Sequence, residues 1–361
     1  MVMDAVPATM AAVLLTGNGG FDKLSFREDV PVPVPGAGEV LIRVGAAGVN
    51  NTDINTRTAW YSKAVVAATE AGGGAGFAEA RTEDSGWTGA IPQFPRIQGA
   101  DACGRIVAVG SGVDPGRIGE RVLVEPVFHG ASRFEAIYFG SEVDGGFAQF
   151  ARVPSRHAHR IASTLSDIEL ASFPCAYSAA ENMLTRAALA AGERVLITGA
   201  SGGVGSAAVQ LAHRRGAEVA ALASPDKAEA VRALGAARTE PRGADCLALF
   251  GQEHFDVVID IAGGDGFPAL LNVLKRGGRY AVAGAISGPI AQLDLRTLYL
   301  KDLSLFGCTI LDPGVFANLV GYIERGEIRP VVAATWPLAQ IVTAQQAFLE
   351  KRHVGKIVLV P

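Results

Sequence analysis

A glycine-rich turn carries the strongest chemical signal in this chain of 361 residues. Residues 194–205 read Arg-Val-Leu-Ile-Thr-Gly-Ala-Ser-Gly-Gly-Val-Gly, a short apolar run followed by the turn. Gly199 permits a tight turn after a strand, and Gly202 and Gly203 remove side chains that would hold a phosphate away from the backbone. Gly205 lets the following helix pack closely, and the free N–H groups of that helix attract anions. The predicted pyrophosphate-binding residues are Gly199, Ser201, Gly202, Gly203 and Val204.

The choice of dinucleotide is indicated about 20 residues further along, where the next apolar run ends. A protein that binds NAD(H) places Asp or Glu there for the ribose hydroxyls. Residues 218–223 end instead in Ser224-Pro225-Asp226-Lys227. The hydroxyl of Ser224 and the cation of Lys227 favour the 2′-phosphate of NADP(H). Ser224 can at the same time cap a helix that has Pro225 at its first position, and Asp226 keeps NAD(H) open as the alternative.

Alternating helical and apolar segments from about residue 165 position this turn. The cadence is typical of βαβ units and predicts an α/β fold with a parallel, doubly wound sheet. The predicted helices span residues 167–186, 203–214, 225–234 and 267–274, and the predicted strands span 194–198, 218–223, 256–261, 279–283 and 303–309.

The two ends of the chain have a different sequence pattern from the middle. Residues 10–165 contain short Val/Ile runs with many Gly and Pro, which predicts a β-rich domain of short strands. After about residue 326 β-rich sequence returns, so the last strand, 355–361, is expected to fold back onto the first domain. We therefore predict one domain from residues 1–165 and 326–361, and a second from 166–325. Residues 62–93 are the least periodic and predict a long loop or insertion.

Composition excludes several classes of partner. The net charge of −4 and the pI of about 5.9 offer no basic footprint for nucleic acid. We find no apolar run of the roughly 20 residues that span a bilayer, and no basic start typical of a signal peptide. The cysteines, Cys103, Cys175, Cys246 and Cys308, lie far apart and are typical of reduced thiols. We expect a cytoplasmic protein that acts on a small molecule.

Four segments carry a resemblance to a known family: 38–44 (Gly-Glu-Val-Leu-Ile-Arg-Val), 99–110 (Gly-Ala-Asp-Ala-Cys-Gly, then Val-Ala-Val-Gly), 145–150 (Gly-Gly-Phe-Ala-Gln-Phe) and the turn 199–205. The chain resembles the medium-chain dehydrogenase/reductase superfamily from Met10 to Pro361, with Met1–Ala8 as an expected disordered extension. The resemblance implies a GroES-like β domain formed by both chain ends and a Rossmann domain inserted between them. It also implies a homodimer joined near residues 303–309. Ser178 and Gly284 complete the predicted cofactor-binding residues.

Zinc-dependent members of this superfamily carry three protein ligands to a catalytic metal, and the resemblance shows which residues stand there. The first ligand is a Cys three residues before an Asp, and Asn50 stands three residues before Asp53. The second lies in a Gly-His-Glu motif, which here reads Gly99-Ala100-Asp101. Only Cys175 keeps its thiol, and one thiolate cannot hold zinc. Residues 122–149 also lack the cysteines of a structural zinc lobe. We predict a metal-free site, in which Cys175 serves as a small buried residue.

Asn50, Thr52 and Tyr61 are the predicted catalytic residues. Asn at the first position matches the quinone-reductase branch, whose motif is similar to Gly-Val-Asn. The Asn50 amide could donate a hydrogen bond to a substrate carbonyl, or it could order the loop. Thr52 stands where zinc enzymes keep a relay hydroxyl, but it could also close a turn. Tyr61, with Trp60, could supply an aromatic surface or be plain packing. The proton could come from solvent, Tyr61 or Thr52.

The sequence leaves the roles of two neighbouring features undecided. Asp53 and Arg57 could form an ion pair, or Arg57 could present its charge to the cleft. Residues 62–93 could form a lid or substrate wall, a solvent-facing insertion, or a subunit contact.

Together these patterns predict an NADPH-dependent, zinc-free oxidoreductase that transfers hydride to a quinone or an α,β-unsaturated carbonyl. Two alternatives stay open. One is a zinc-type alcohol dehydrogenase, and the other is an NADPH-binding protein without turnover.

Overall fold

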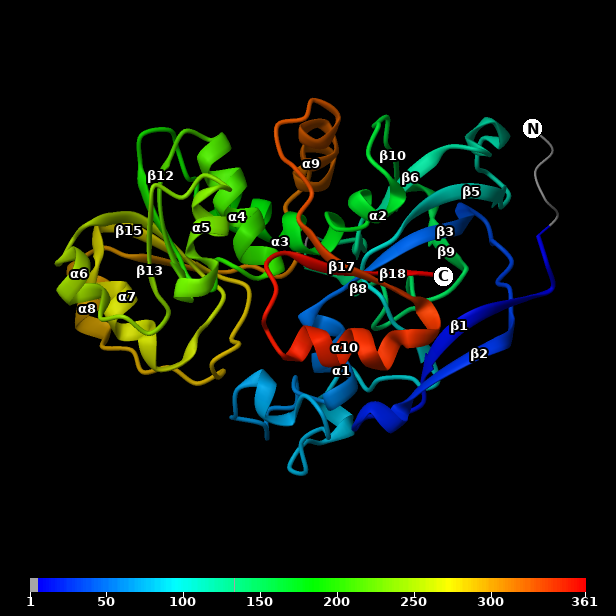
Figure 1. Ribbon diagram of the computed structural model, residues 1–361, viewed down its shortest axis with the longest axis horizontal. Helices are drawn as coiled ribbons and strands as arrows, with labels where there is room; N and C mark the ends of the chain where they lie inside the picture. The colour runs from blue at the N-terminus through cyan, green and yellow to red at the C-terminus, as the bar shows by residue number, and fades with distance from the viewer. Residues whose placement is uncertain (1–5, 133) are drawn as a thin grey trace.

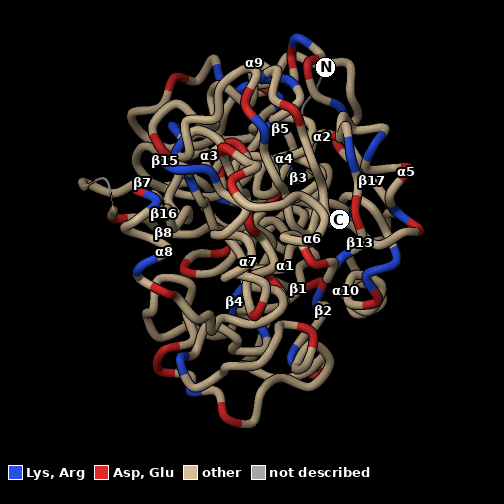
Figure 2. The backbone as a smooth tube through the Cα atoms, turned by 90° about the vertical axis from the view of Figure 1, so that its left-hand side faces the viewer, with Lys and Arg blue, Asp and Glu red and all other residues tan. Residues whose placement is uncertain are grey.

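The structure, a computed structural model, describes residues 6–132 and 134–361. Residues 1–5 of the predicted N-terminal extension lie outside this part. Figure 1 shows two units side by side along the long axis, one rich in strands and one of alternating strands and helices. Among the helices of the described part, none combines the length and apolar character that crossing a bilayer requires. Lys and Arg are interleaved with Asp and Glu along the chain (Figure 2), in keeping with the mild net charge of −4.

The β-rich unit is built mainly from the first part of the chain. The order β10-β6-β5-β3-β18-β17 forms its largest sheet, with β9 also paired to β3; β2-β1-β4 and β7-β8 form two smaller sheets. Its elements in this part of the chain are β1 (Thr9–Leu15), β2 (Leu24–Pro31), β3 (Glu39–Val49), α1 (Asn51–Thr58), β4 (Arg96–Ile97), β5 (Cys103–Val109), β6 (Arg121–Val124), β7 (Val127–His129), β8 (Ala136–Tyr138), β9 (Phe150–Pro154) and β10 (Ala158–Arg160).

The end of the chain completes this sheet. β17 (Val332–Pro337), α10 (Ile341–Leu349) and β18 (Lys356–Val360) follow the second unit. β18 pairs antiparallel with β3, so the red and blue strands of Figure 1 lie side by side. The last strand therefore returns to the first ones, and the limits at residues 165 and 326 stay a prediction for the domain boundary.

The second unit is a six-stranded parallel sheet in the order β13-β12-β11-β14-β15-β16. The predicted α/β class and doubly wound parallel sheet are confirmed. Its elements are α3 (Pro174–Arg186), β11 (Arg194–Ile197), α4 (Gly203–Arg214), β12 (Glu218–Ala223), α5 (Ala228–Arg232), β13 (Arg238–Pro241), α6 (Cys246–Phe250), β14 (Phe255–Asp260), α7 (Phe267–Asn272), β15 (Leu274–Val282), α8 (Leu295–Leu300), β16 (Ser304–Gly307) and α9 (Val315–Glu324). The short helix α2 (Asp167–Leu170), which precedes α3, packs against β3, β5, β17 and β18 of the β-rich unit.

Side chains of the central strands are buried on both faces, as a parallel sheet between helices requires. Val195 and Ile197 point into one core, which includes residues of α3, α4 and α9. Leu196, between them, points into a second core with residues of α7. Alternate side chains of β11 therefore pack against different helices on the two faces of the sheet. This packing holds the end of the strand, where the glycine turn begins, in place.

The structure also departs from the predicted elements. The helix predicted over 167–186 is broken, because α2 ends at Leu170 and α3 begins at Pro174, whose ring has no N–H to donate in a helix interior. β13 and α9 were not predicted, and α10 lies in a segment expected to be β-rich.

Candidate functional site

The glycine turn lies where the strand order reverses, between β11 and β14. This crevice is where doubly wound sheets bind ligands. Gly199 has a φ of +57°, and a Cβ on Gly205 would lie 2.2 Å from the Gly199 carbonyl oxygen. At Gly202 a Cβ would have its nearest contact 3.6 Å away. The backbone is therefore tight where the strand and α4 meet and open at the N-terminus of α4, which fits a pyrophosphate.

The turn also touches the start of β18 from the other unit. The Gly355 N–H donates to the Ser201 carbonyl at 3.1 Å. A Cβ on Gly203 would lie 3.0 Å from Cδ of Lys356. The predicted cofactor residues Ser201 and Gly203 thus lie at the junction of the two units.

The other predicted cofactor residues near the turn are more enclosed. Val204 is half-buried against the core. The buried Ser178 hydroxyl donates to the Cys175 carbonyl at 3.2 Å, within its own helix. Gly284 follows β15, and a Cβ there would lie 2.9 Å from the Ile261 carbonyl oxygen. Gly284 therefore keeps the ends of β14 and β15 close together, whereas the Ser178 hydroxyl already has a partner.

Ser224 and Lys227 lie at the end of β12, as predicted from their positions. Ser224 is the residue before the 3₁₀ helix η6 (Pro225–Lys227), and Pro225 is the first residue of that helix. A hydrogen bond from Ser224 lowers the pKa of Asp226. The Lys227 ammonium donates to the Lys351 carbonyl in the segment before β18. Lys227 therefore ties the end of β12 to the C-terminal segment.

More cations gather at this place than the sequence indicated. The Arg242 N–H donates to the carbonyl of Ala223, the last residue of β12, at 3.1 Å. Burial, together with the charges of Lys227 and Arg242, lowers the pKa of Lys351 to about 8. Burial and the neighbouring lysines lower the pKa of His353 to about 4. Burial is the main cause of both shifts, and the neighbouring positive charges add to it; an anionic ligand would offset these charges.

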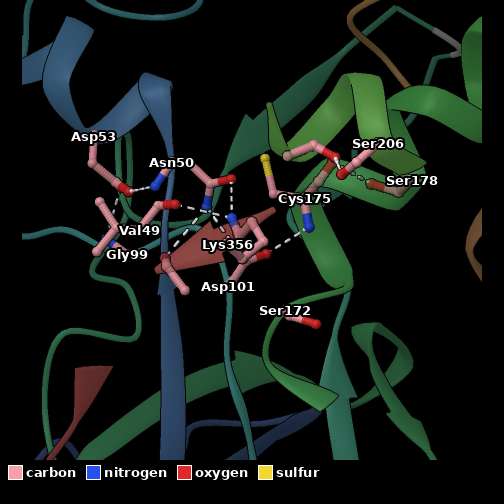
Figure 3. A network of polar contacts seen from close by, with 12 residues as sticks. Val49, Asn50, Asp53, Gly99, Asp101, Ser172, Cys175, Ser178, Ser206 and Lys356 are labelled. Atoms are coloured by element: carbon pink, nitrogen blue, oxygen red, sulfur yellow. Dashed lines mark hydrogen bonds and ion pairs between the residues drawn. The ribbon is translucent and has the colours of Figure 1, made fainter. Parts of the chain in front are cut away.

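A buried polar network occupies the positions at which the resemblance places zinc ligands (Figure 3). The Lys356 ammonium lies 2.7 Å from Asp101 Oδ2 and donates to Asn50 Oδ1 at 2.5 Å and to the Val49 carbonyl at 3.0 Å. Asp101 Oδ1 accepts from the backbone N–H of Cys175 at 2.6 Å. We call Asn50, Asp101, Cys175 and Lys356 the polar centre. It joins both units, because Cys175 is the second residue of α3 and Lys356 is the first residue of β18.

The hydrogen-bonding capacity of the polar centre is largely used within the protein. The three N–H bonds of Lys356 have three acceptors, and the Asn50 amide donates to Asp101 at 2.8 Å and to the Gly48 carbonyl at 3.3 Å. Asn50 is also the N-cap of α1, where its backbone N–H donates to Asp53 at 2.7 Å. The geometry therefore favours the ordering role of Asn50 over contact with a substrate.

These residues do not fit a catalytic zinc. Zinc needs thiolate, imidazole or carboxylate ligands, and the first two positions hold an amide and the methyl group of Ala100. Burial, with the nearby Asp101 charge, raises the pKa of Cys175 to about 12, so its thiol stays protonated. In residues 6–132 and 134–361, no cluster of three or more His, Cys, Asp or Glu side chains could hold a metal ion.

Hydroxyl groups from three segments lie in this region, and that of Tyr138 contacts Cys175. The Tyr61 hydroxyl donates to Thr52 Oγ1 at 3.0 Å, and burial raises the pKa of Tyr61 to about 12. Tyr138 Oη lies 3.0 Å from Cys175 Sγ. The structure thus brings the predicted residues Thr52 and Tyr61 together and adds Tyr138, which the sequence did not indicate.

Comparisons with known proteins agree with this architecture. The family model described as "Alcohol dehydrogenase GroES-like domain" matches residues 36–163, and "Zinc-binding dehydrogenase" matches residues 203–325. The "Quinone oxidoreductase" of Lama guanicoe is 28% identical over 97% of each chain. The "Acryloyl-coenzyme A reductase" of Metallosphaera sedula is 28% identical over 97% of this chain and 99% of its own. A solved structure from Sinorhizobium meliloti 1021, described as a candidate alcohol dehydrogenase, is 48% identical with a TM-score of 0.88, covering 99% of this chain and 98% of that one.

The chain belongs to the medium-chain dehydrogenase/reductase superfamily. It falls in the quinone oxidoreductase-like branch, and it is an oxidoreductase of that superfamily.

In this oxidoreductase Asp53 and Arg57 bind different partners. Asp53 accepts from the backbone N–H groups of Asn50 and Gly99, and burial raises its pKa to about 7. The fully buried Arg57 guanidinium donates to the Gly73 carbonyl at 2.6 Å and to Gln345 at 2.9 Å. Arg57 therefore neither pairs with Asp53 nor faces a cleft. It anchors the insertion to α10.

The insertion of this oxidoreductase, residues 62–93, spans the two units. The Thr69 N–H donates to the carbonyl of Ile286, in the loop after β15, at 3.2 Å. At its other end Trp87 stacks on Tyr138, with ring centroids 4.4 Å apart. The insertion therefore reaches both the cofactor unit and the tyrosine beside Cys175, which favours the substrate-wall interpretation over a purely solvent-facing loop.

Proposed function

We propose that this oxidoreductase is an NADPH-dependent, metal-free reductase of quinones or α,β-unsaturated carbonyl compounds. The observation that carries the proposal is Lys356, whose ammonium group donates to Asn50, at the first zinc-ligand position, and lies 2.7 Å from Asp101, the residue after the second position; its third acceptor is the Val49 carbonyl. A cation held among these residues disfavours a second, divalent cation at the same place. Relatives named as reductases of a quinone and of an acryloyl thioester support the same chemistry, because both names describe a conjugated carbonyl acceptor.

When bound, the reduced nicotinamide supplies a hydride. The open N-terminus of α4 at Gly202 would hold the pyrophosphate, and Lys227, Arg242 and Lys351 would hold the 2′-phosphate. Asp226 is exposed and already accepts from Ser224, which weakens the case for NADH. Gly203 and Ser201 place the turn against the start of β18, so that the bound dinucleotide would lie beside the polar centre.

The remaining predicted residues would act around the substrate. Asn50 would serve as a positioning residue, since its amide hydrogens are engaged within the protein. Thr52 and Tyr61 form a hydrogen-bonded pair that could pass a proton, because the Thr52 hydroxyl keeps its own hydrogen while accepting from Tyr61. The insertion would form one wall of the substrate space.

The test combines metal analysis with turnover. We expect the purified protein to contain substoichiometric zinc and to oxidise NADPH with a panel of quinones and enones, with a rate unchanged by a chelator. Stoichiometric zinc, with activity on alcohols that is lost on chelation, would establish the alcohol dehydrogenase alternative that the 48% identical neighbour suggests. Tight NADPH binding without turnover of any panel member would establish the non-enzymatic alternative.

We also propose a homodimer that forms through the edge strand β16. This strand ends the order of the parallel sheet, and apolar side chains near it are exposed. An open edge beside apolar surface is typical of an interface. The exposed side chains are Ile290, Leu295, Tyr299, Leu300 and Leu305. Light scattering should give twice the chain mass of 37.4 kDa. The double variant Tyr299→Asp with Leu300→Asp should lower the measured mass to that of a single chain.

A cytoplasmic location is part of the same proposal. Cys103, Cys175, Cys246 and Cys308 are all free in the structure, which is typical of a reducing compartment. Labelling with a thiol reagent after unfolding should modify all four.

A further inference from the structure

The hydroxyl of Tyr138 is a strong donor with a weak partner. Tyr138 is the last residue of β8 and is only 6% exposed. Its Oη lies 3.0 Å from Cys175 Sγ. A phenol O–H forms strong hydrogen bonds, whereas a sulfur atom accepts and donates only weakly. Buried tyrosines normally find an oxygen or nitrogen partner, so the present contact leaves part of the Tyr138 bonding capacity unused.

Most of the other hydrogen-bond donors near Tyr138 already have oxygen acceptors within the protein. The N–H bonds of Lys356 and the amide of Asn50 have acceptors within the polar centre. Tyr61 donates to the oxygen of Thr52. Of these groups, Tyr138 and the hydroxyl hydrogen of Thr52 are the ones that could turn to a substrate without breaking a strong bond.

The ring of Tyr138 is also held in place from outside the β-rich sheets. Trp87 of the insertion stacks on it at 4.4 Å with an angle of 25° between the rings. Burial, and then the neighbouring Cys175, raise the pKa of Tyr138 well above its ordinary value. The hydroxyl therefore stays protonated at neutral pH and points from a rigid ring.

We propose that Tyr138 Oη donates the hydrogen bond that holds the carbonyl oxygen of the substrate, taking this oxygen as partner in place of Cys175 Sγ. The inference rests on the proposed function and names the group that serves it. In an enone, the reduced nicotinamide would supply the hydride that forms a C–H bond at the β-carbon, and the C=C electron pair would shift toward the carbonyl oxygen. Tyr138 stabilises the resulting enolate, and water protonates the α-carbon.

The variant Tyr138→Phe tests this, because it keeps the ring and its stack on Trp87 and removes only the hydroxyl. We expect kcat for an enone to fall about a hundredfold, the typical effect of losing one such donor, with a smaller change in KM. The dissociation constant of NADPH should not change. Tyr322→Phe, in α9 beside Glu181, is the matched control and should retain activity.

A second readout does not depend on turnover. Acetophenone bound together with NADP⁺ cannot be reduced, and the infrared stretch of its carbonyl reports a hydrogen bond directly. The stretch should move to lower frequency on the wild-type protein, and Tyr138→Phe should abolish this shift. If Tyr138→Phe does not fold, 3-fluorotyrosine at position 138, whose hydroxyl is a stronger donor, should deepen the shift.

The outcomes separate this inference from the proposed function. If Tyr138→Phe keeps both kcat and the infrared shift while Thr52→Val loses them, the donor is the pair formed by Thr52 and Tyr61 and the inference is wrong. If the wild-type protein reduces neither quinones nor enones, the proposed function fails. Acetophenone then still tests Tyr138, since loss of the shift in Tyr138→Phe supports its contact with a carbonyl and persistence of the shift overturns it.

Discussion

The glycine turn takes its residues from the single segment 199–205, whereas the polar centre beside it draws Asn50, Asp101, Cys175 and Lys356 from four separated segments. The two regions touch where Gly203 meets the Lys356 side chain. The turn works through backbone groups and the absence of side chains, and the polar centre works through paired charges. The difference indicates that dinucleotide binding is a local property of this chain, and that the treatment of the substrate depends on how its two units assemble.

Substitution of Lys356 in the polar centre is expected to cause the largest loss of stability. Lys356→Met leaves the Asp101 carboxylate, which is fully buried, without its cation. Removal of one member of a buried ion pair typically costs about 3–5 kcal/mol of unfolding free energy. Urea unfolding should show this loss, and Arg352→Met, at a side chain that is 85% exposed, is the control and should change little.

The double variant Lys356→Met with Asp101→Asn sharpens the interpretation. Because it removes both charges, it should recover part of the loss. If the double variant is as unstable as the sum of the two single variants, the ion pair is not the source of the effect and the contrast drawn above loses its basis.

The turn should give the next largest effect. Gly205→Ala would place a Cβ 2.2 Å from the Gly199 oxygen, and α4 would have to move away from β11. Overpacking of this kind costs about 1–3 kcal/mol. Gly202→Ala is the matched variant, since its Cβ would make only an ordinary contact, 3.6 Å from the Gly199 oxygen, and it should keep stability while weakening NADPH binding. Equal loss of stability in both variants would show that the open cradle is not a real feature of the turn.

The same contrast explains what the sequence could predict. The β11, α4 and β12 segments follow from local periodicity and glycine placement, and the structure confirms α4 and β12 with the predicted bounds. Lys356 was missed because its partner Asn50 is 306 positions away, and a single lysine before an apolar strand has no distinctive pattern. Tyr138 was missed because it lies in a strand of three residues. Long-range pairing of this kind leaves no local signal.

A smaller effect is expected on the preference for NADPH over NADH when Lys227 is substituted. Lys227→Glu replaces a cation at the end of β12 with an anion, and we expect NADPH to bind at least about tenfold more weakly while NADH changes much less. Fluorescence titration with both dinucleotides measures the ratio. Arg232→Glu makes the same change in charge at an exposed side chain of α5 and is the control. Equal weakening of NADPH and NADH binding would contradict the assignment of the 2′-phosphate to the end of β12. It would favour the alternative in which Asp226 binds the ribose of NADH.

The smallest effect concerns pH. Burial and the charges of Lys227 and Arg242 lower the pKa of Lys351 from 10.5 to about 8, so this ammonium loses its proton as the pH rises through about 8. Because the 2′-phosphate gains from a protonated lysine, the preference for NADPH over NADH should fall severalfold across this range, and Lys351→Met should flatten the profile. The same shift makes the charged Lys351 a cost to folding, and this cost disappears as the pH rises from about 8 to 10.5. A preference that stays constant through this range would mean that Lys351 does not face the phosphate, and the crowding of cations there would then be a feature of the fold alone.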